Sequence, residues 1–283
     1  MSYDYYRNNV EKFQPSSYKI LFRPVTLPIS LVEAKGHLKL DISDTSEDVY
    51  LNSLISSVTN FAEKYTKRDF ITKKYLTYID CFFEPITLRR NRVSEIVSIQ
   101  YLKETVLTAV DSSIYYLTDE QNDFADILLY DGACFPSDLD NRKQAIQIQF
   151  YSGFGVKIES ADLVTNVVTV TTVDNHYFTT GQSIVISGAN ESIFNGTFII
   201  TVTGDKTFTY AVTNANITAT GTLFANDIPQ DLKTAMLQHV SRVYENRGDC
   251  DAGNKAACDI SSSINLPAET KQTYAMYRIW EVL

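Results

Sequence analysis

The sequence predicts an α+β fold, with a small α-helical bundle, an antiparallel β-region and an inserted all-β, sandwich-like domain. Three patterns support this prediction. Amphipathic helical stripes lie near both ends of the 283-residue chain, and hydrophobicity alternates with period two between about residues 73 and 153. A stretch rich in Thr, Val and Asn follows over residues 156–226. Helix resumes directly after that stretch, which indicates an insertion.

These patterns divide the chain into three expected parts. The first is an extended N-terminal arm that ends at the Arg23-Pro24 break, and the second is a main domain whose helical frame holds the β-region 73–153. The third is the inserted β-domain. In residue numbers the arm is 1–26, the main domain is 27–155 plus 227–283, and the inserted domain is 156–226.

Two helices are predicted at the start of the main domain. Ser30 followed by Glu33 is a capping box, in which each side chain bonds the other residue's backbone N–H, and this helix should run to about Leu40. A Ser/Asp/Thr-rich turn then leads into the second helix. Its single apolar stripe, about 100° wide, consists of Leu51, Leu54, Ile55, Val58, Ala62 and Tyr65.

Two further helices are predicted near the C-terminus. Pro229 suits the first position of a helix, because its missing N–H costs nothing there, and Gly248 should end that helix. The apolar stripe between them consists of Leu232, Ala235, Met236, Val240 and Val243. A last helix is expected to start at Pro267 and to run through Tyr274, Tyr277 and Trp280 to the C-terminus.

Strands of the β-region are predicted from alternation of apolar and polar residues. The two clearest apolar series are Val97, Ile99 and Tyr101, and Ile146, Ile148 and Phe150. Further strands are expected at Tyr75–Cys81, Ile114–Leu117 and Phe124–Tyr130. Within the insertion we expect strands at Val167–Val173, Ser183–Ser187, Gly196–Val202 and Thr207–Val212. Asn195-Gly196 predicts a type I′ hairpin, since both central positions of that turn need φ > 0.

The formal net charge of −9 argues against a protein that wraps nucleic acid, because such proteins need Lys and Arg to displace counterions from phosphate. An acidic surface serves solubility, or it repels DNA that passes along it without sticking. The N-terminus has no apolar stretch like a signal peptide, and no segment has the length and apolarity of a transmembrane span.

The residue pattern predicts no catalytic, cofactor-binding or metal-binding site, and hence no enzyme. Cys81, Cys134, Cys250 and Cys258 are scattered without the spacing of a zinc site, so reduced thiols are expected. His37 and His239 are expected to pack or cap helices, and His176 to lie in a turn. Asp138 with Asp140, and Asp249 with Asp251, lack the other ligands of a calcium loop.

Two sets of residues are candidates for a partner or inter-subunit interface. The basic set is Arg89, Arg90 and Arg92, and the C-terminal set is Tyr274, Tyr277, Arg278 and Trp280. Arginine suits bidentate contacts with carboxylates, and Tyr, Trp and Arg are typical of interface hot spots. The alternatives are that the basic set is a solvated face and that the C-terminal set completes the helical core.

The order of these elements resembles that of phage head–tail connector (adaptor) proteins. The N-terminal likeness is to "L-x-x-A-K-x-H-L", an acidic turn and "E-x-x-T-x-R", with matches at Leu31, Ala34, Lys35, His37, Leu38, Glu47, Asp48, Glu63, Thr66 and Arg68. The later helix matches at Pro229, Leu232, Ala235, Tyr244, Asn246 and Arg247, and the ending at Leu266, Pro267, Tyr277, Arg278 and Trp280. The likeness covers about residues 27–155 and 228–280, so it includes neither the arm nor the insertion.

This resemblance implies a structural virion protein of the bacteriophage neck, assembled in the host cytoplasm. Subunits would form a closed homo-oligomeric ring, commonly a dodecamer, that docks under the portal protein and offers a platform for a head-closure or tail protein. DNA would pass through the ring's channel without sequence-specific binding, and neither a membrane nor a cofactor is involved. An alternative role is a virion decoration protein that binds carbohydrate or another surface through 156–226, with Tyr177, Phe178 and Phe194 as candidate stacking residues. The commoner role of such rings is to pack in the core of a hairpin.

Overall fold

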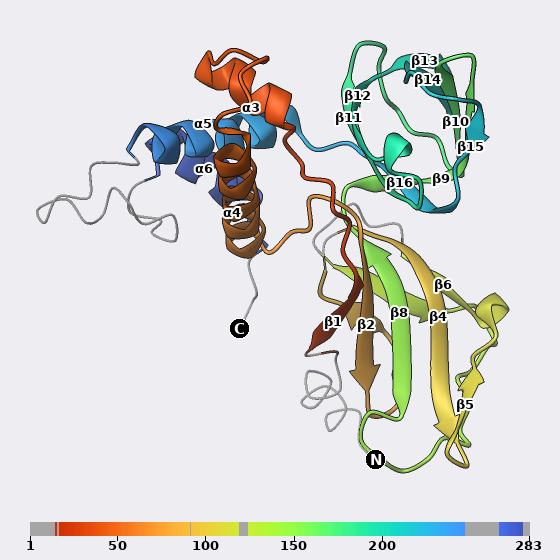
Figure 1. Ribbon diagram of the computed structural model, residues 1–283. Helices are drawn as coiled ribbons and strands as arrows, with labels where there is room; N and C mark the ends of the chain where they lie inside the picture. The colour runs from red at the N-terminus through yellow and green to blue at the C-terminus, as the bar shows by residue number, and fades with distance from the viewer. Residues whose placement is uncertain (1–14, 16, 91, 119–123, 247–265, 280–283) are drawn as a thin grey trace, which may run out of the picture. The chain divides into compact units, whose positions relative to one another are not determined.

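The computed structural model describes residues 15, 17–90, 92–118, 124–246 and 266–279 (Figure 1). The described chain combines α-helices with antiparallel sheets, so the predicted α+β class, with its all-β part, is confirmed. It forms two compact units. Residues 1–23 and 72–153 belong to the first unit, and residues 24–71 and 154–283 belong to the second.

The first unit contains two antiparallel sheets. Its elements are β1 Tyr18–Phe22, β2 Lys73–Ile79, β3 Ile86–Leu88, β4 Val93–Lys103, β5 Val106–Ala109, the 3-10 turn η1 Ser112–Ile114, β6 Tyr115–Leu117, β7 Ala125–Leu129 and β8 Ile146–Ser152. The larger sheet has the order β1-β2-β8-β4-β5 and the smaller one β3-β7-β6. The described part of the arm is therefore an edge strand, β1, paired with β2.

The predicted alternation holds on β8 and fails at one point on β4. Ile146, Ile148 and Phe150 are all fully buried, as expected. Val97, however, is 39% exposed, so its predicted place on the apolar face is wrong. The reason is a register shift of β4 against β8 between Ile96 and Ser98, which turns Val97 outward and packs Ile96 on the core instead.

The helices of the second unit are α3 Leu31–Leu38, α4 Asp48–Thr66, α5 Gln230–Glu245 and α6 Ala268–Met276. The Ser30–Glu33 capping box is present in full, which confirms the predicted start of α3. Pro229 is the N-cap of α5, one position before the predicted one, and α5 ends at Glu245. The expected stop at Gly248 lies outside the described residues.

The predicted extent of the last helix is wrong, because α6 ends at Met276. After Met276 the hydrogen bonding changes to the three-residue spacing of a 3-10 turn, since the Arg278 N–H donates to the carbonyl of Ala275. The Ile279 N–H then donates to the carbonyl of Thr66, at the end of α4. This bond to another helix draws the chain away from the axis of α6. Trp280 lies outside the described residues.

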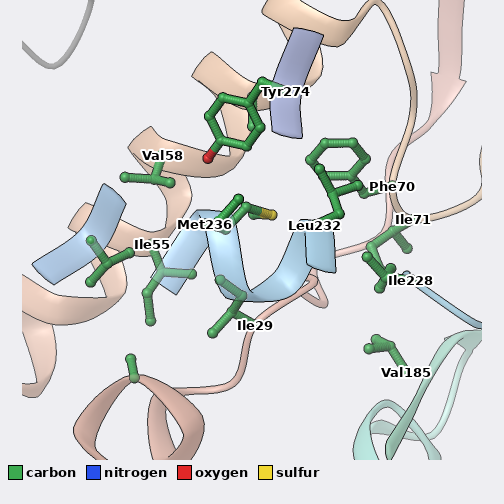
Figure 2. Close-up of a cluster of buried hydrophobic side chains, with 14 of the residues drawn as sticks. Ile29, Ile55, Val58, Phe70, Ile71, Val185, Ile228, Leu232, Met236 and Tyr274 are labelled. Atoms are coloured by element: carbon green, nitrogen blue, oxygen red, sulfur yellow. The ribbon is translucent and has the colours of Figure 1, made fainter. Parts of the chain in front are cut away.

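The helices pack around one apolar core, which Figure 2 shows. The predicted stripes of α4 and α5 supply half of its buried residues, including Leu54, Ile55, Leu232 and Met236. Val185 of the second β-region belongs to the same cluster and lies on the side of Ile71 and Ile228 (Figure 2). The helical frame and this β-region therefore share a core residue.

The second β-region is an eight-stranded antiparallel sheet that nearly closes on itself. Its order is β12-β11-β16-β9-β10-β14-β13, with β15 paired to β9. The strands are β9 Gly155–Val164, β10 Val167–Thr172, β11 Ser183–Ala189, β12 Gly196–Ile199, β13 Thr201–Gly204, β14 Thr207–Ala211, β15 Ile217–Thr218 and β16 Gly221–Asn226, and the 3-10 turn η2 is Ser192–Phe194. The predicted single strand Gly196–Val202 is divided at the buried Ile200, and its two halves are the end strands of the sheet.

The predicted Asn195-Gly196 type I′ turn is also wrong. Asn195 has φ −90°, and its side chain bonds both the N–H and the carbonyl of Ala189, which holds a longer loop closed. A pair of positive φ angles occurs instead at Thr165 and Asn166, in the two-residue connection between β9 and β10. The hydrogen bonds from the Asn195 side chain to Ala189 thus outweigh the preference of Asn-Gly for a type I′ turn.

Candidate subunit interface

Arg90 of the basic set is engaged within its own unit. Its guanidinium carbon lies 5.0 Å from the ring centre of Tyr18 and 4.7 Å from that of Tyr75. The Arg89 N–H donates to the Tyr18 hydroxyl at 2.8 Å. Burial raises the pKa of Tyr18, whose ring also meets Phe150 edge-on. Arg90 therefore holds the edge strand β1 on the sheet through cation–π contacts.

The side chains on either side of Arg90 have a different setting. Arg89 and Arg92 are exposed, and Arg92 adopts a positive φ of 44°. Arg89, Arg90 and Arg92 were placed in one set because they are neighbours along the chain. The structure separates them into one inward-facing and two outward-facing side chains.

The structure brings together the described members of the C-terminal set, at the end of α6. Tyr274 is fully buried among Phe61, Tyr65 and His239. The Tyr277 hydroxyl donates to Asp231 at 2.8 Å, and burial, together with this bond, raises its pKa to about 12. These contacts fasten α6 to α4 and α5.

Arg278 completes this attachment. Its guanidinium carbon lies 5.4 Å from the ring centre of Tyr65, on α4. Arg68, which follows α4, donates to the backbone carbonyl of Tyr277. The end of α4 and the residues after α6 are therefore in direct contact, and two half-buried arginines lie at this contact.

Two buried lysines were not expected from sequence. Lys35 has 4% of its side chain exposed, and its ammonium group donates to the carbonyls of Ile42 and Asp44 at 3.3 and 2.6 Å. It also pairs with Asp48 at 2.5 Å. Lys35 thus fixes the α3–α4 turn against both helices. The only signal in the sequence was a lysine beside Ala34 on the apolar face of α3.

Lys233 on α5 links the frame to the second β-region. Its ammonium nitrogen lies 3.5 Å from both the Glu33 carboxylate and the Ser183 hydroxyl. The Ser183 hydroxyl is 3.4 Å from Glu33, so three elements meet at this point. Glu33 therefore serves the capping box of α3 and this junction at once.

The histidines have structural settings. His37 is exposed, so the packing role predicted for it is wrong. It lies in the last turn of α3, at the end of the helix. His176 is buried, and its Nδ1 accepts the N–H of Phe178 at 2.9 Å. His239 is buried and meets Phe61 edge-on with ring centres 5.2 Å apart, which confirms the packing role predicted for it.

His239 should make the stability of the second unit depend on pH. Burial lowers its pKa to about 4, whereas an unfolded histidine has a pKa near ~6.5. The unfolded chain therefore binds more protons between these values, and the free energy of unfolding falls as the pH decreases, by at most about 1.4 kcal/mol per pH unit. Urea unfolding at pH 7 and pH 5 measures this loss, which His239→Phe should reduce. An unchanged pH profile in that variant would contradict the assignment.

The candidate acidic loops are structural where they are described. Asp138 forms an ion pair with Lys103 at 2.6 Å, and Asp140 accepts the backbone N–H groups of Glu104 and Thr105 at 2.8 and 2.9 Å. Asp249 and Asp251 lie outside the described residues. Within the described ranges, no three His, Cys, Asp or Glu side chains gather as metal ligands would.

The aromatic residues considered for carbohydrate stacking are mostly in the core. Phe178 is 7% exposed and Phe194 is fully buried, so neither is available for stacking. Tyr177 is 86% exposed, with a positive φ of 55°. Of the three rings considered for carbohydrate stacking, only that of Tyr177 is therefore exposed. Among the helices of the described chain, none is both long and apolar enough to cross a membrane.

The comparisons with known proteins identify the class to which this chain belongs, structural proteins of the phage virion. The model of one family matches residues 28–171, slightly more than half of the chain. The chain belongs to that family, the phage gp6-like head-tail connector proteins. It is a structural adaptor at the junction of head and tail in the virion. The match continues past residue 155, into β9 and β10.

Solved structures share the fold. A chain in the neck of an empty gene transfer agent (GTA) particle, computed with C6 symmetry, has a TM-score of 0.54 at 14% identity, with 94% of this chain and 97% of that chain covered. A chain in the virion of a native GTA particle has a TM-score of 0.51 at the same identity and coverage. No curated protein matches.

Proposed function

We propose that the chain is a non-enzymatic subunit of a closed ring of twelve copies. The ring docks under the portal protein, continues the DNA channel and carries the next head-closure or tail protein. Membership of the connector family is the observation that supports this proposal most strongly. The shared fold with a chain of a particle neck computed with C6 symmetry adds to it, because six-fold symmetry accommodates twelve copies.

The charge of the chain fits a conduit for DNA. With a net charge of −9, a ring of these subunits repels the phosphate backbone and does not retain it. Lys35 and Lys233, the most deeply buried lysines of the described residues, hold helices and turns together. This use of polar groups supports a role that depends on shape. We propose that Arg89, Arg92, Tyr277 and Arg278 contact neighbouring subunits or the portal.

Electron microscopy of the purified protein, alone and with the portal ring of the same phage, tests this function. We expect annular particles, or a complex in which the chain forms a ring on the portal. Mass photometry of the same samples counts the copies. A chain that stays monomeric and never binds the portal ring would overturn the proposal.

We further propose that residues 156–226 are an inserted domain that the frame does not need in order to fold. The Asp227 N–H donates to the carbonyl of Phe154 at 3.2 Å, so the two ends of the insertion lie side by side. Excision of 155–226, with two glycines joining 154 to 227, should keep the helical circular dichroism signal. The thermal midpoint should fall, because Val185 leaves the core and Lys233 loses Ser183. A chain without cooperative unfolding would count against a separable domain.

A further inference from the structure

One end of the helical frame is acidic and carries exposed apolar side chains. This end is the turn between α3 and α4, where Asp41 and Asp44 are both exposed. Ile42 lies between them and is 59% exposed, and Val49, in the first turn of α4, is 85% exposed. Lys35 holds the turn in place by bonding its carbonyls. We call these four side chains, Asp41, Ile42, Asp44 and Val49, the acidic end.

The carboxylates of the acidic end are held in the charged form. Asp41 accepts the Ser43 N–H at 2.8 Å, and Asp44 accepts the Ser46 N–H at 2.9 Å. These backbone hydrogen bonds lower the pKa of both carboxyl groups. The turn therefore presents two fixed negative charges over the range in which proteins normally work.

The opposite end of the frame is basic and also carries an exposed apolar side chain. Lys64 is exposed in the last turn of α4, and Lys67 is the C-cap, with φ 58°. Met276 is 73% exposed, and the residues after it are fastened to this end of α4 by the bond from Ile279 to Thr66. We call Lys64, Lys67 and Met276 the basic end.

The two ends are separate surfaces with complementary charge. The 19 residues of α4 separate them by roughly 28 Å, at about 1.5 Å per residue. A contact between two different surfaces of identical subunits is heterologous, and repetition of it gives a ring when the rotation from one copy to the next closes. Each surface offers an exposed apolar side chain, Val49 or Met276, that such a contact would bury among charges of opposite sign.

We propose that neighbouring subunits meet head to tail through the helical frame, with the acidic end of one copy against the basic end of the next. This contact rests on the proposed function, because it presupposes a ring. It goes beyond that function by assigning the two surfaces that join the copies. The partner of each end is a second copy of this chain.

Charge reversal at both ends tests the contact. Asp41→Lys with Asp44→Lys, and separately Lys64→Glu with Lys67→Glu, place like charges opposite each other, so each pair should lower the ring fraction about tenfold or more. The chain carrying all four changes restores opposite charges in exchanged positions and should recover most of the rings. Mass photometry at one subunit concentration and low salt measures the fraction, after circular dichroism has shown each variant to be folded.

Single apolar positions give a second measurement that does not depend on the charge pairs. Val49→Asp and Met276→Asp should abolish rings without lowering the thermal midpoint, because both side chains are exposed in the subunit. Val106→Asp is the matched control, since Val106 is 64% exposed on β5 of the other unit, and it should leave rings intact.

The outcomes separate the contact from the function. If the unaltered chain forms rings and the single-end variants do so equally well, the contact is overturned while the ring proposal stands. The same holds if the four changes together fail to restore rings. If the unaltered chain never forms a ring, even on the portal, the proposed function is overturned and the contact with it.

Discussion

Tyr274→Ala is expected to lower the free energy of unfolding of the second unit by about 3–5 kcal/mol. Its side chain is fully buried, and its ring centre lies 6.1 Å from that of Tyr65 and 6.4 Å from that of Phe61. Removal of the ring leaves a cavity between α4, α5 and α6. The nine residues of α6 are too few to form a stable helix alone, so α6 depends on this packing.

Urea unfolding followed by far-ultraviolet circular dichroism measures this loss. Tyr274→Phe is the matched control, because the Tyr274 hydroxyl is buried with no hydrogen-bond partner within the described part of the chain. That variant keeps the ring and should change the free energy of unfolding by less than about 1 kcal/mol. A loss below about 1 kcal/mol in Tyr274→Ala would show that α6 is not packed as described.

Lys35→Met should lower the free energy of unfolding by about 2–4 kcal/mol. The substitution keeps the length of the apolar stem but removes the ammonium group. The carbonyls of Ile42 and Asp44 and the carboxylate of Asp48 then lose their shared donor. Asp48 is 25% exposed, so water replaces part of the lost interaction and keeps the effect below that of a fully buried pair.

Lys271→Met is the control for Lys35→Met. Lys271 is exposed on α6, and loss of an exposed charge usually changes stability by no more than about 0.5 kcal/mol. Urea unfolding of the two variants side by side measures the difference. Equal stabilities would mean that the buried ammonium group does not hold the α3–α4 turn. Because that turn carries Asp41 and Asp44, Lys35→Met should also reduce ring formation.

The start of α3 and the apolar stripe of α4 could be predicted from the sequence. The capping box at Ser30 and Glu33 requires only side chains three positions apart, and the stripe of α4 requires only the period of the helix. The same holds for Ile146, Ile148 and Phe150 on β8, whose alternation reflects one buried face. Each of these patterns arises from residues that are neighbours in both sequence and space.

The residues of the candidate interface could be predicted only in part from the sequence. In the sequence, nothing distinguishes Arg90 from its neighbours Arg89 and Arg92. Its inward orientation is shown only by its contact with the ring of Tyr18, a residue 71 positions before Arg89. Tyr274 has the composition of a contact residue, but its burial depends on three helices from both ends of the chain. The pairing of Lys233 with Glu33, 200 positions apart, has no signal in local sequence at all.

By itself, the sequence determined the fold class, the main helices and strands, and the membership of the connector family, since these follow from short-range periodicity, capping and ordered motifs. The tertiary structure decided where the strand register shifts at Val97, how Asn195 closes its loop, and where α6 ends at Met276. It also decided which lysines are buried and which charges lie at the two ends of the frame. These features depend on hydrogen bonds and packing between residues distant in sequence, whose free energies exceed the local preferences that a sequence reveals.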